Sequence, residues 1–230
     1  GGVEGLGYGE SLGRFIVGDG ADLPMADELV SLIAADPAHE LAAARAELLR
    51  AMRNGFVLEG RSDLEHRWKQ ASVLASAHGH GVPLTVHPGI GYDIISNHPI
   101  FNGAAIGRAA QIDFQTFAGT LEQLNGGVVL SIGSAIMGPQ VFEKALSCVN
   151  HIRLKEGRGI VKNHSMYGVD LQDGGNWDWT KGEPPITSSA YYLRFCKTYA
   201  RMGGSMYYLQ CDNLAFVQHL SRALGVSNPS

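Results

Sequence analysis

Cysteine is scarce in this sequence. Cys148, Cys196 and Cys211 are the only three among 230 residues, and they lie far apart. An odd number of widely spaced cysteines disfavours both a disulfide framework and a four-cysteine zinc site. Such cysteine usage is typical of a reducing compartment, so we expect a cytoplasmic location.

Long apolar runs and blocks of positive charge are also lacking. No apolar run reaches the ~18 residues that a membrane-spanning helix needs, so we expect no membrane partner. The net charge is -4 and the isoelectric point is about 6.1. Because no basic cluster is present to attract a polyanion, we also expect no nucleic-acid partner.

Glycine and apolar residues are plentiful, with 30 glycines and an apolar fraction of 45%. Apolar runs typical of strands cover residues 82–89, 127–133, 166–171 and 205–211, and helical patterns alternate with them. This alternation predicts an α/β fold in which helices flank both faces of a parallel sheet. No repeat or linker interrupts the chain, so we expect a single domain over residues 1–230.

Helix signals are clear at several places. The expected helices cover residues 23–36, 37–55, 62–77, 104–124, 139–149, 188–203 and 212–225. Ser62 and Glu65 have the spacing of a capping box, and Asp212 is the expected N-cap of the last helix. The glycine-dense residues 1–20 are expected to form a loop.

Three glycine- or aspartate-bearing segments follow expected strands: residues 87–93, 133–139 and 211–213. In parallel α/β sheets, ligands bind beyond the carboxyl ends of the strands. Gly133 and Ser134 would let a ligand approach the backbone, and the next helix would offer its free N–H groups to a phosphate. A tight connection that needs glycine for its own turn explains the same residues equally well.

Two further groups of polar residues leave their role open. Asp93 suits a cationic substrate group or a ribose hydroxyl, but it also suits the cap of a short helix. His78, His80, His87 and His98 form a loose cluster whose spacing matches no metal motif. We expect no metal, although a metal-dependent hydrolase built on these histidines is a remote alternative.

Lys197 lies on an expected helix between Phe195 and Tyr199. Its ammonium either extends to water or is held, at least partly buried, against an apolar wall of these two rings. In the second case a neutral lysine amine becomes a nucleophile for imine formation. Trp177 and Trp179, in an irregular loop, either cover a ligand or partner subunit or pack within that loop.

Four segments together resemble the deoxyhypusine synthase family in order and approximate spacing. They are GGVE (1–4), VPLTVHPGIGYDII (82–95), GGVVLSIGSAIMGPQVFEKAL (126–146) and AYYLRFCKTYARMGGSMYYLQCDNLAF (190–216). That family has a Rossmann-like NAD-binding fold, and it works as a tetramer with active sites between subunits. It oxidises spermidine and passes the aminobutyl group through a lysine imine to a protein lysine.

The resemblance implies a role for individual residues. Lys197 falls on the catalytic lysine and Asp93 on a polyamine-binding acid. Glu4, Gly133 with Ser134, and Asp212 fall on cofactor positions. The resemblance also implies that an NAD-contacting segment precedes Gly1.

The sequence departs from the family pattern around the substrate. Phe195 replaces the tryptophan two residues before the lysine, and Tyr191 replaces an acidic residue. Gly133-Ser134-Ala135 stands in place of three glycines, and Gly138-Pro139 replaces basic and histidine positions.

These departures indicate a divergent relative. We expect an NAD-dependent transferase or oxidoreductase acting on a small amine or carbonyl compound, with Asp93, Phe195 and Tyr191 near the substrate. The alternative is a nucleotide- or sugar-nucleotide-binding protein without covalent catalysis, in which Lys197 neutralises phosphate. We also expect a homo-oligomer.

Overall fold

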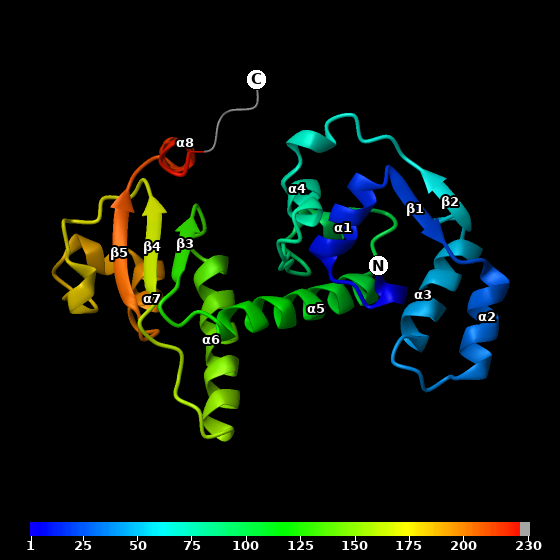
Figure 1. Ribbon diagram of the computed structural model, residues 1–230, viewed down its shortest axis with the longest axis horizontal. Coiled ribbons are helices and arrows are strands. Elements are labelled where there is room, and N and C mark those ends of the chain that lie inside the picture. The colour runs from blue at the N-terminus through cyan, green and yellow to red at the C-terminus, as the bar shows by residue number, and fades with distance from the viewer. Residues whose placement is uncertain (226–230) are drawn as a thin grey trace. The chain divides into compact units, whose positions relative to one another are not determined.

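The computed structural model describes residues 1–225, and their contacts group into two compact units (Figure 1). The first unit covers residues 1–117 and the second begins at residue 118. The long helix α5 (Gly103–Glu122) contributes to both. A single domain over residues 1–230 stays a prediction from the sequence, and the two units are described separately.

The first unit is mainly helical. Before α5 it contains η1 (Gly2–Glu4), α1 (Tyr8–Val17), β1 (Gly20–Leu23), α2 (Ala26–Ala35), α3 (Ala42–Arg53), β2 (Gly60–Asp63), η2 (Lys69–Ala71), α4 (Val73–Gly79) and η3 (Ile94–Asn97). Helix α1 packs on α4, α2 packs on α3, and β1 pairs with β2 in antiparallel orientation. Leu29, Ala44 and Ala75 are buried between these elements.

The expected loop over residues 1–20 is wrong, because it contains helix α1. Glycine is a poor helix former, but here it permits close packing. A Cβ atom on Gly9 would lie 1.9 Å from the carbonyl oxygen of Leu84, and one on Gly13 would lie 2.7 Å from that of Leu74. The glycines therefore bring α1 against the backbone of residues 74–84.

The expected helix over residues 62–77 is also wrong. Ser62 lies in β2, where it pairs with Ala21, so it caps no helix. Helix α4 begins only at Val73, and its cap is Ser72, whose hydroxyl accepts a hydrogen bond from the Ala75 amide at 3.3 Å. Pairing with a distant strand thus overrides a local capping signal.

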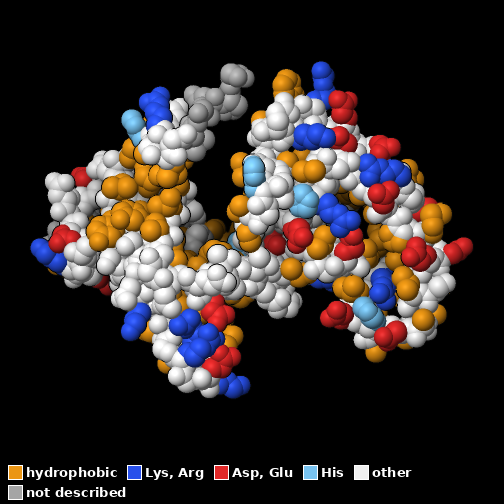
Figure 2. Space-filling view, viewed as in Figure 1, with side chains coloured by type: hydrophobic (Ala, Val, Ile, Leu, Met, Phe, Trp, Pro, Cys, Tyr) orange, Lys and Arg blue, Asp and Glu red, His pale blue; other side chains and the backbone are white. Residues whose placement is uncertain are grey.

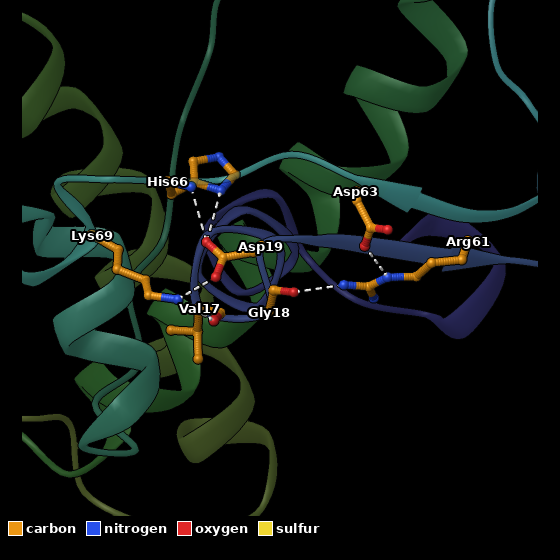
Figure 3. A network of polar contacts seen from close by, with 7 residues as sticks. All are labelled: Val17, Gly18, Asp19, Arg61, Asp63, His66 and Lys69. Atoms are coloured by element: carbon orange, nitrogen blue, oxygen red, sulfur yellow. Dashed lines mark hydrogen bonds and ion pairs between the residues drawn. The ribbon is translucent and has the colours of Figure 1, made fainter.

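The turn that leads into β1 is tied to residues 66–69 by the carboxylate of Asp19 (Figure 3). It accepts hydrogen bonds from the His66 amide at 2.9 Å and from Lys69 Nζ at 2.5 Å. The Lys69 bond is the main reason why the pKa of Asp19 is lowered. Arg61 adds a bond to the carbonyl of Gly18 at 2.8 Å. Each charged side chain of this network is paired within it, so the network has a structural role.

The second unit is a mixed α/β structure, as the sequence predicts. It contains β3 (Val128–Ile132), α6 (Met137–Lys155), β4 (Ser165–Asp170), η4 (Trp179–Lys181), η5 (Ser189–Tyr192), α7 (Arg194–Ala200), β5 (Ser205–Gln210) and α8 (Asn213–Ala223). The strands form a parallel sheet in the order β3-β4-β5. The expected strand over residues 82–89 does not form. In this segment the Val86 amide donates to the carboxylate of Asp113 rather than to a neighbouring strand.

Helices α6 and α7 pack together and cover one face of this sheet. Tyr199 of α7 donates a hydrogen bond to the Ser131 hydroxyl at 3.1 Å, and its ring meets that of Phe142 of α6. Met166 and Met206 are buried on the same face. Right-handed crossovers between strands in sequential order place both connecting helices on one side.

The opposite face of the sheet is only partly covered within the described residues, unlike the expected two-sided arrangement. The rings of Tyr167 and Tyr207 stack there with centroids 4.9 Å apart. Val128, Leu130 and Leu209 are exposed on this face, and hydrophobic side chains gather over β4 and β5 in Figure 2. Across residues 1–225, none of the helices has the length and apolar character needed to span a membrane.

Candidate functional site

The loops after β3 and β5 meet at the carboxyl edge of the sheet. Gly133 follows β3 with a φ of +74°, and a Cβ atom there would lie 2.8 Å from Nδ2 of Asn213. Asn213 is the first residue of α8, directly after Asp212. The two segments expected to bind a cofactor are therefore neighbours, although they are 80 residues apart in the sequence.

Polar side chains at this edge accept hydrogen bonds from the first turns of the two helices that start there. The Ser134 hydroxyl accepts a hydrogen bond from the Gly138 amide at 2.8 Å, in the first turn of α6. Oδ1 of Asp212 accepts one from the Ala215 amide at 2.9 Å, which confirms Asp212 as the cap of α8. The Ser134 hydroxyl therefore already bonds one of the amides that a phosphate would use. The carboxylate of Asp212 is exposed, and its second oxygen can accept a hydrogen bond from another donor.

The residues at this edge fit a dinucleotide at two points. At Gly133 the backbone carries no side chain, so a ligand can approach it closely. The carboxylate of Asp212 is exposed and can accept a hydrogen bond from a ribose hydroxyl. A tight strand-to-helix connection has the same two properties. The local geometry therefore agrees both with a cofactor loop and with a purely structural turn.

Lys197 is largely buried, as imine chemistry requires. Its side chain is 14% exposed, and Nζ lies 3.5 Å from Oε1 of Glu183. The same nitrogen lies 3.4 Å from the centroid of the Tyr191 ring. Lys197 therefore contacts one carboxylate oxygen and one aromatic face.

Glu183 connects Lys197 to a second cation. Its other oxygen is paired with the guanidinium of Arg201. The pKa of Glu183 is lowered, first by the hydrogen bond from Arg201 and then by Lys197. Glu183 is therefore a carboxylate placed between two positive charges.

The ring beside Lys197 differs from the expected apolar wall. Phe195 and Tyr199 are buried against the sheet: Phe195 lies near Gly168 and Tyr208, and Tyr199 bonds to Ser131. Side chains two positions away on a helix point to the opposite side. Tyr191, from the preceding turn η5, supplies the ring instead, so Phe195 is a core residue in this structure.

A pocket of about 400 Å³ surrounds Lys197. Its other lining residues are Tyr191, Tyr192, Arg194, Thr198 and Arg201. Three cationic and two aromatic side chains suit an anionic or planar group better than a polyamine. Lys197 contacts Glu183 and Tyr191, whereas Gly133 lies against Asn213 and bonds to the Val169 carbonyl. The described contacts therefore do not bring the lysine and the glycine loop together.

Glu4 and Asp93 lie in the first unit. Glu4 forms an ion pair with Arg14 at 2.8 Å. The carboxylate of Asp93 accepts a hydrogen bond from the Gly89 amide, and its own amide donates to the Gly89 carbonyl at 3.0 Å. Asp93 therefore closes the turn before η3, where it is the N-cap residue but makes no side-chain bond to the helix.

The histidine cluster shows no metal geometry. Among residues 1–225, no three His, Cys, Asp or Glu side chains are placed to hold a metal ion. His87 Nε2 lies 3.0 Å from the Thr85 hydroxyl, and burial lowers the pKa of His87. The three cysteines are free thiols, and burial raises the pKa of Cys196 far above its ordinary value.

The tryptophan loop packs on its own unit. Trp179 is 3% exposed, and Trp177 Nε1 donates a hydrogen bond to the Gly182 carbonyl at 3.0 Å. This is the arrangement of a loop packed on itself. Trp179 is therefore buried without a partner subunit.

Sequence reasoning missed two carboxylates. Glu183 gives no local signal beyond its place before two prolines. Asp113 is 2% exposed on α5 and accepts hydrogen bonds from the amides of Gly9 at 3.0 Å and Val86 at 2.8 Å. An aspartate between Ile112 and Phe114 was a usable signal, because an acid on an apolar helix face requires donors.

Comparisons with models of protein families, with curated proteins and with solved structures gave no match.

Proposed function

We propose that this chain is a deoxyhypusine-synthase-like protein with a Rossmann-like fold that binds NAD at the carboxyl edge of the β3-β4-β5 sheet. The observation that carries the proposal is the contact between Gly133 and Asn213, which brings the expected cofactor loop next to Asp212. Gly133 would admit the pyrophosphate and Asp212 a ribose hydroxyl. NAD, when bound, supplies a hydride acceptor.

The proposed substrate is a small amine or carbonyl compound, and the proposed catalytic residue is Lys197. Its burial supports this role, and Tyr191 would flank the substrate. Imine formation uses the neutral amine, so Lys197 would have to give up its proton and its ion pair with Glu183 before it attacks a carbonyl. Asp93 and Glu4 remain proposed contacts for substrate and cofactor by resemblance, as do the cytoplasmic location and the homo-oligomer.

The same contacts favour a second candidate, a nucleotide- or sugar-nucleotide-binding protein without covalent catalysis. The pocket around Lys197 has three cationic side chains, and the contacts described there include a single carboxylate, Glu183, so positive charge is in excess and could bind phosphate. Arg194 and Arg201 line the same pocket and would add to that affinity. In this case Lys197 acts through its charge alone.

Thermal melting tests the cofactor proposal. A ligand that binds only the native state raises the melting temperature by mass action. We expect millimolar NAD to raise it by several degrees, and Ser134→Trp to abolish the rise by filling the loop. Ser147→Trp, at an exposed position of α6, is the matched control and should keep it. A wild-type chain whose melting ignores NAD and NADH would contradict the proposal.

A further inference from the structure

The first unit contains a pocket of about 650 Å³, within the range of small-molecule sites. Residues 1–108 supply its whole lining, so it belongs to this unit alone. Its apolar walls include Leu6, Phe15, Leu23, Leu29, Leu32 and Leu48. These side chains come from α1, β1, α2, α3 and the segment after η1, so elements distant in the sequence enclose one apolar space.

Charged side chains line the same pocket, and most of them are already paired. Glu4 is paired with Arg14 at 2.8 Å, Glu47 with Arg50 at 2.9 Å, and Asp22 with Arg61 at 3.2 Å. Charged and hydrophobic side chains accordingly lie side by side over α1, α2 and α3 (Figure 2). These groups would add little to the affinity for a charged ligand, because each of them already forms an ion pair within the protein.

Arg45 of α3 and Arg108 of α5 differ from these pairs. Both are half-buried and line the pocket, and in the described chain neither guanidinium has an ion pair or hydrogen bond. Arg108 lies near the Gly2 backbone, where a Cβ atom would be 3.8 Å from its NH1. Its field contributes to the lowered pKa of Glu47, whose largest cause is the hydrogen bond from Asn102.

The one acid of the lining without such a pair, Glu28, is exposed in the first turn of α2, where the helix N-terminus stabilises negative charge. The unsatisfied groups of the pocket are therefore two sets of guanidinium donors beside apolar walls. Guanidinium binds carboxylates and related anions through paired hydrogen bonds.

We propose that this pocket binds a small amphipathic anion, with its apolar body among the leucines and its carboxylate or sulfonate on Arg45 and Arg108. The lining includes Glu4, which the resemblance makes a cofactor contact, but the proposed NAD site at Gly133 and Asp212 lies in the second unit. The test of this pocket does not depend on the NAD proposal.

The test compares two dyes that differ in charge. 1-Anilinonaphthalene-8-sulfonate carries a sulfonate, and N-phenyl-1-naphthylamine has the same aromatic body without it. Fluorescence titration of the full chain should give a tighter Kd for the sulfonate. The double variant Arg45→Gln/Arg108→Gln should weaken sulfonate binding roughly tenfold or more and leave the neutral dye unchanged. Arg53→Gln, on α3 outside the pocket, is the matched control and should bind both dyes as the wild type does.

Two variants that fill the pocket locate the binding. Ala51→Trp and Ala105→Trp should each abolish binding of both dyes, and circular dichroism identifies any variant that fails to fold. The proposal is overturned if the wild type does not bind the sulfonate, if the double arginine variant binds it unchanged, or if a folded tryptophan variant binds both dyes normally. Displacement of the dye by NAD would show that the pocket binds the cofactor, and it would contradict the proposal of a separate anion site.

Discussion

At the scale of the residue, variants of Lys197 distinguish covalent catalysis from non-covalent binding. Arginine keeps the charge but forms no imine, whereas alanine removes both. If Lys197 forms an imine, Lys197→Arg and Lys197→Ala should both lose turnover by about a thousandfold or more while NAD still raises the melting temperature. If Lys197 only balances phosphate, the arginine variant should keep most of the ligand affinity.

Borohydride trapping provides the direct measurement. Wild-type protein incubated with NAD and candidate amines, or with the matching aldehydes, should yield a reduced adduct that peptide mapping locates at Lys197. An active enzyme that gives no adduct, together with an active Lys197→Arg variant, would eliminate the imine.

His164 predicts a pH dependence of stability. Its side chain is buried, and neither ring nitrogen has a hydrogen-bond partner among the described residues. Burial lowers the pKa of His164, so the unfolded chain binds a proton more readily than the folded chain. This contribution to stability is complete above about pH 6.5 and is lost as the pH falls below it, with a slope of up to about 1.4 kcal/mol per pH unit.

His164→Leu should remove this part of the slope without loss of stability at pH 7.5, because it replaces a buried imidazole that lacks hydrogen-bond partners by an apolar side chain. Urea unfolding at pH 5.5 and pH 7.5 measures the difference. His80→Gln, at an exposed position, is the control and should keep the wild-type slope. An unchanged slope in His164→Leu would show that other groups cause the acid sensitivity.

At the scale of the element, Gly133 links β3 to the start of α8. Its φ of +74° by itself disfavours any residue with a side chain, and a Cβ atom there would also clash with the side-chain amide of Asn213. Gly157 has nearly the same φ, +73°, but a Cβ atom there would meet nothing within 4 Å. Comparison of the two glycines separates backbone strain from contact.

Gly157→Ala should lower the free energy of unfolding by about 1 kcal/mol, the usual cost of a left-handed alanine. Gly133→Ala should cost more, because the Asn213 side chain must also move, and it should reduce the stabilisation by NAD. Thermal melting with and without NAD measures both effects. Equal losses in the two variants would mean that Asn213 moves aside freely.

At the scale of the whole molecule, we expect a homo-oligomer. The partly exposed sheet face with Tyr167, Tyr207 and Leu209 is compatible with a subunit contact, whereas Trp179 is already buried in its own unit. Multi-angle light scattering at micromolar concentration should give a mass at least twice the 24.6 kDa of one chain. A strictly monomeric mass would contradict this expectation.

The sequence by itself determined the elements whose signals are local. The helices α2, α5 and α8 follow from residue periodicity and nearby caps, because the bonds that form a helix lie within a few residues. Asp212 illustrates this, since it caps α8 through an amide only three residues away. The strands β3, β4 and β5 follow from short apolar runs bounded by turn residues, although their partners are distant in the sequence. The meeting of the Gly133 loop with Asp212 followed from the rule that parallel strands end at one edge.

Only the tertiary structure decided the features that depend on distant residues. Helix α1 forms from a glycine-rich segment because those glycines let it lie against residues 74–84, and Asp113 fixes the Gly9 amide across 104 positions. The partners of Lys197 were likewise hidden, since a backbone turn brings Tyr191 over the ammonium and a separate loop brings Glu183. Sequence periodicity reports which face of a helix is apolar, but the group that meets a polar side chain is chosen by how the chain folds back on itself.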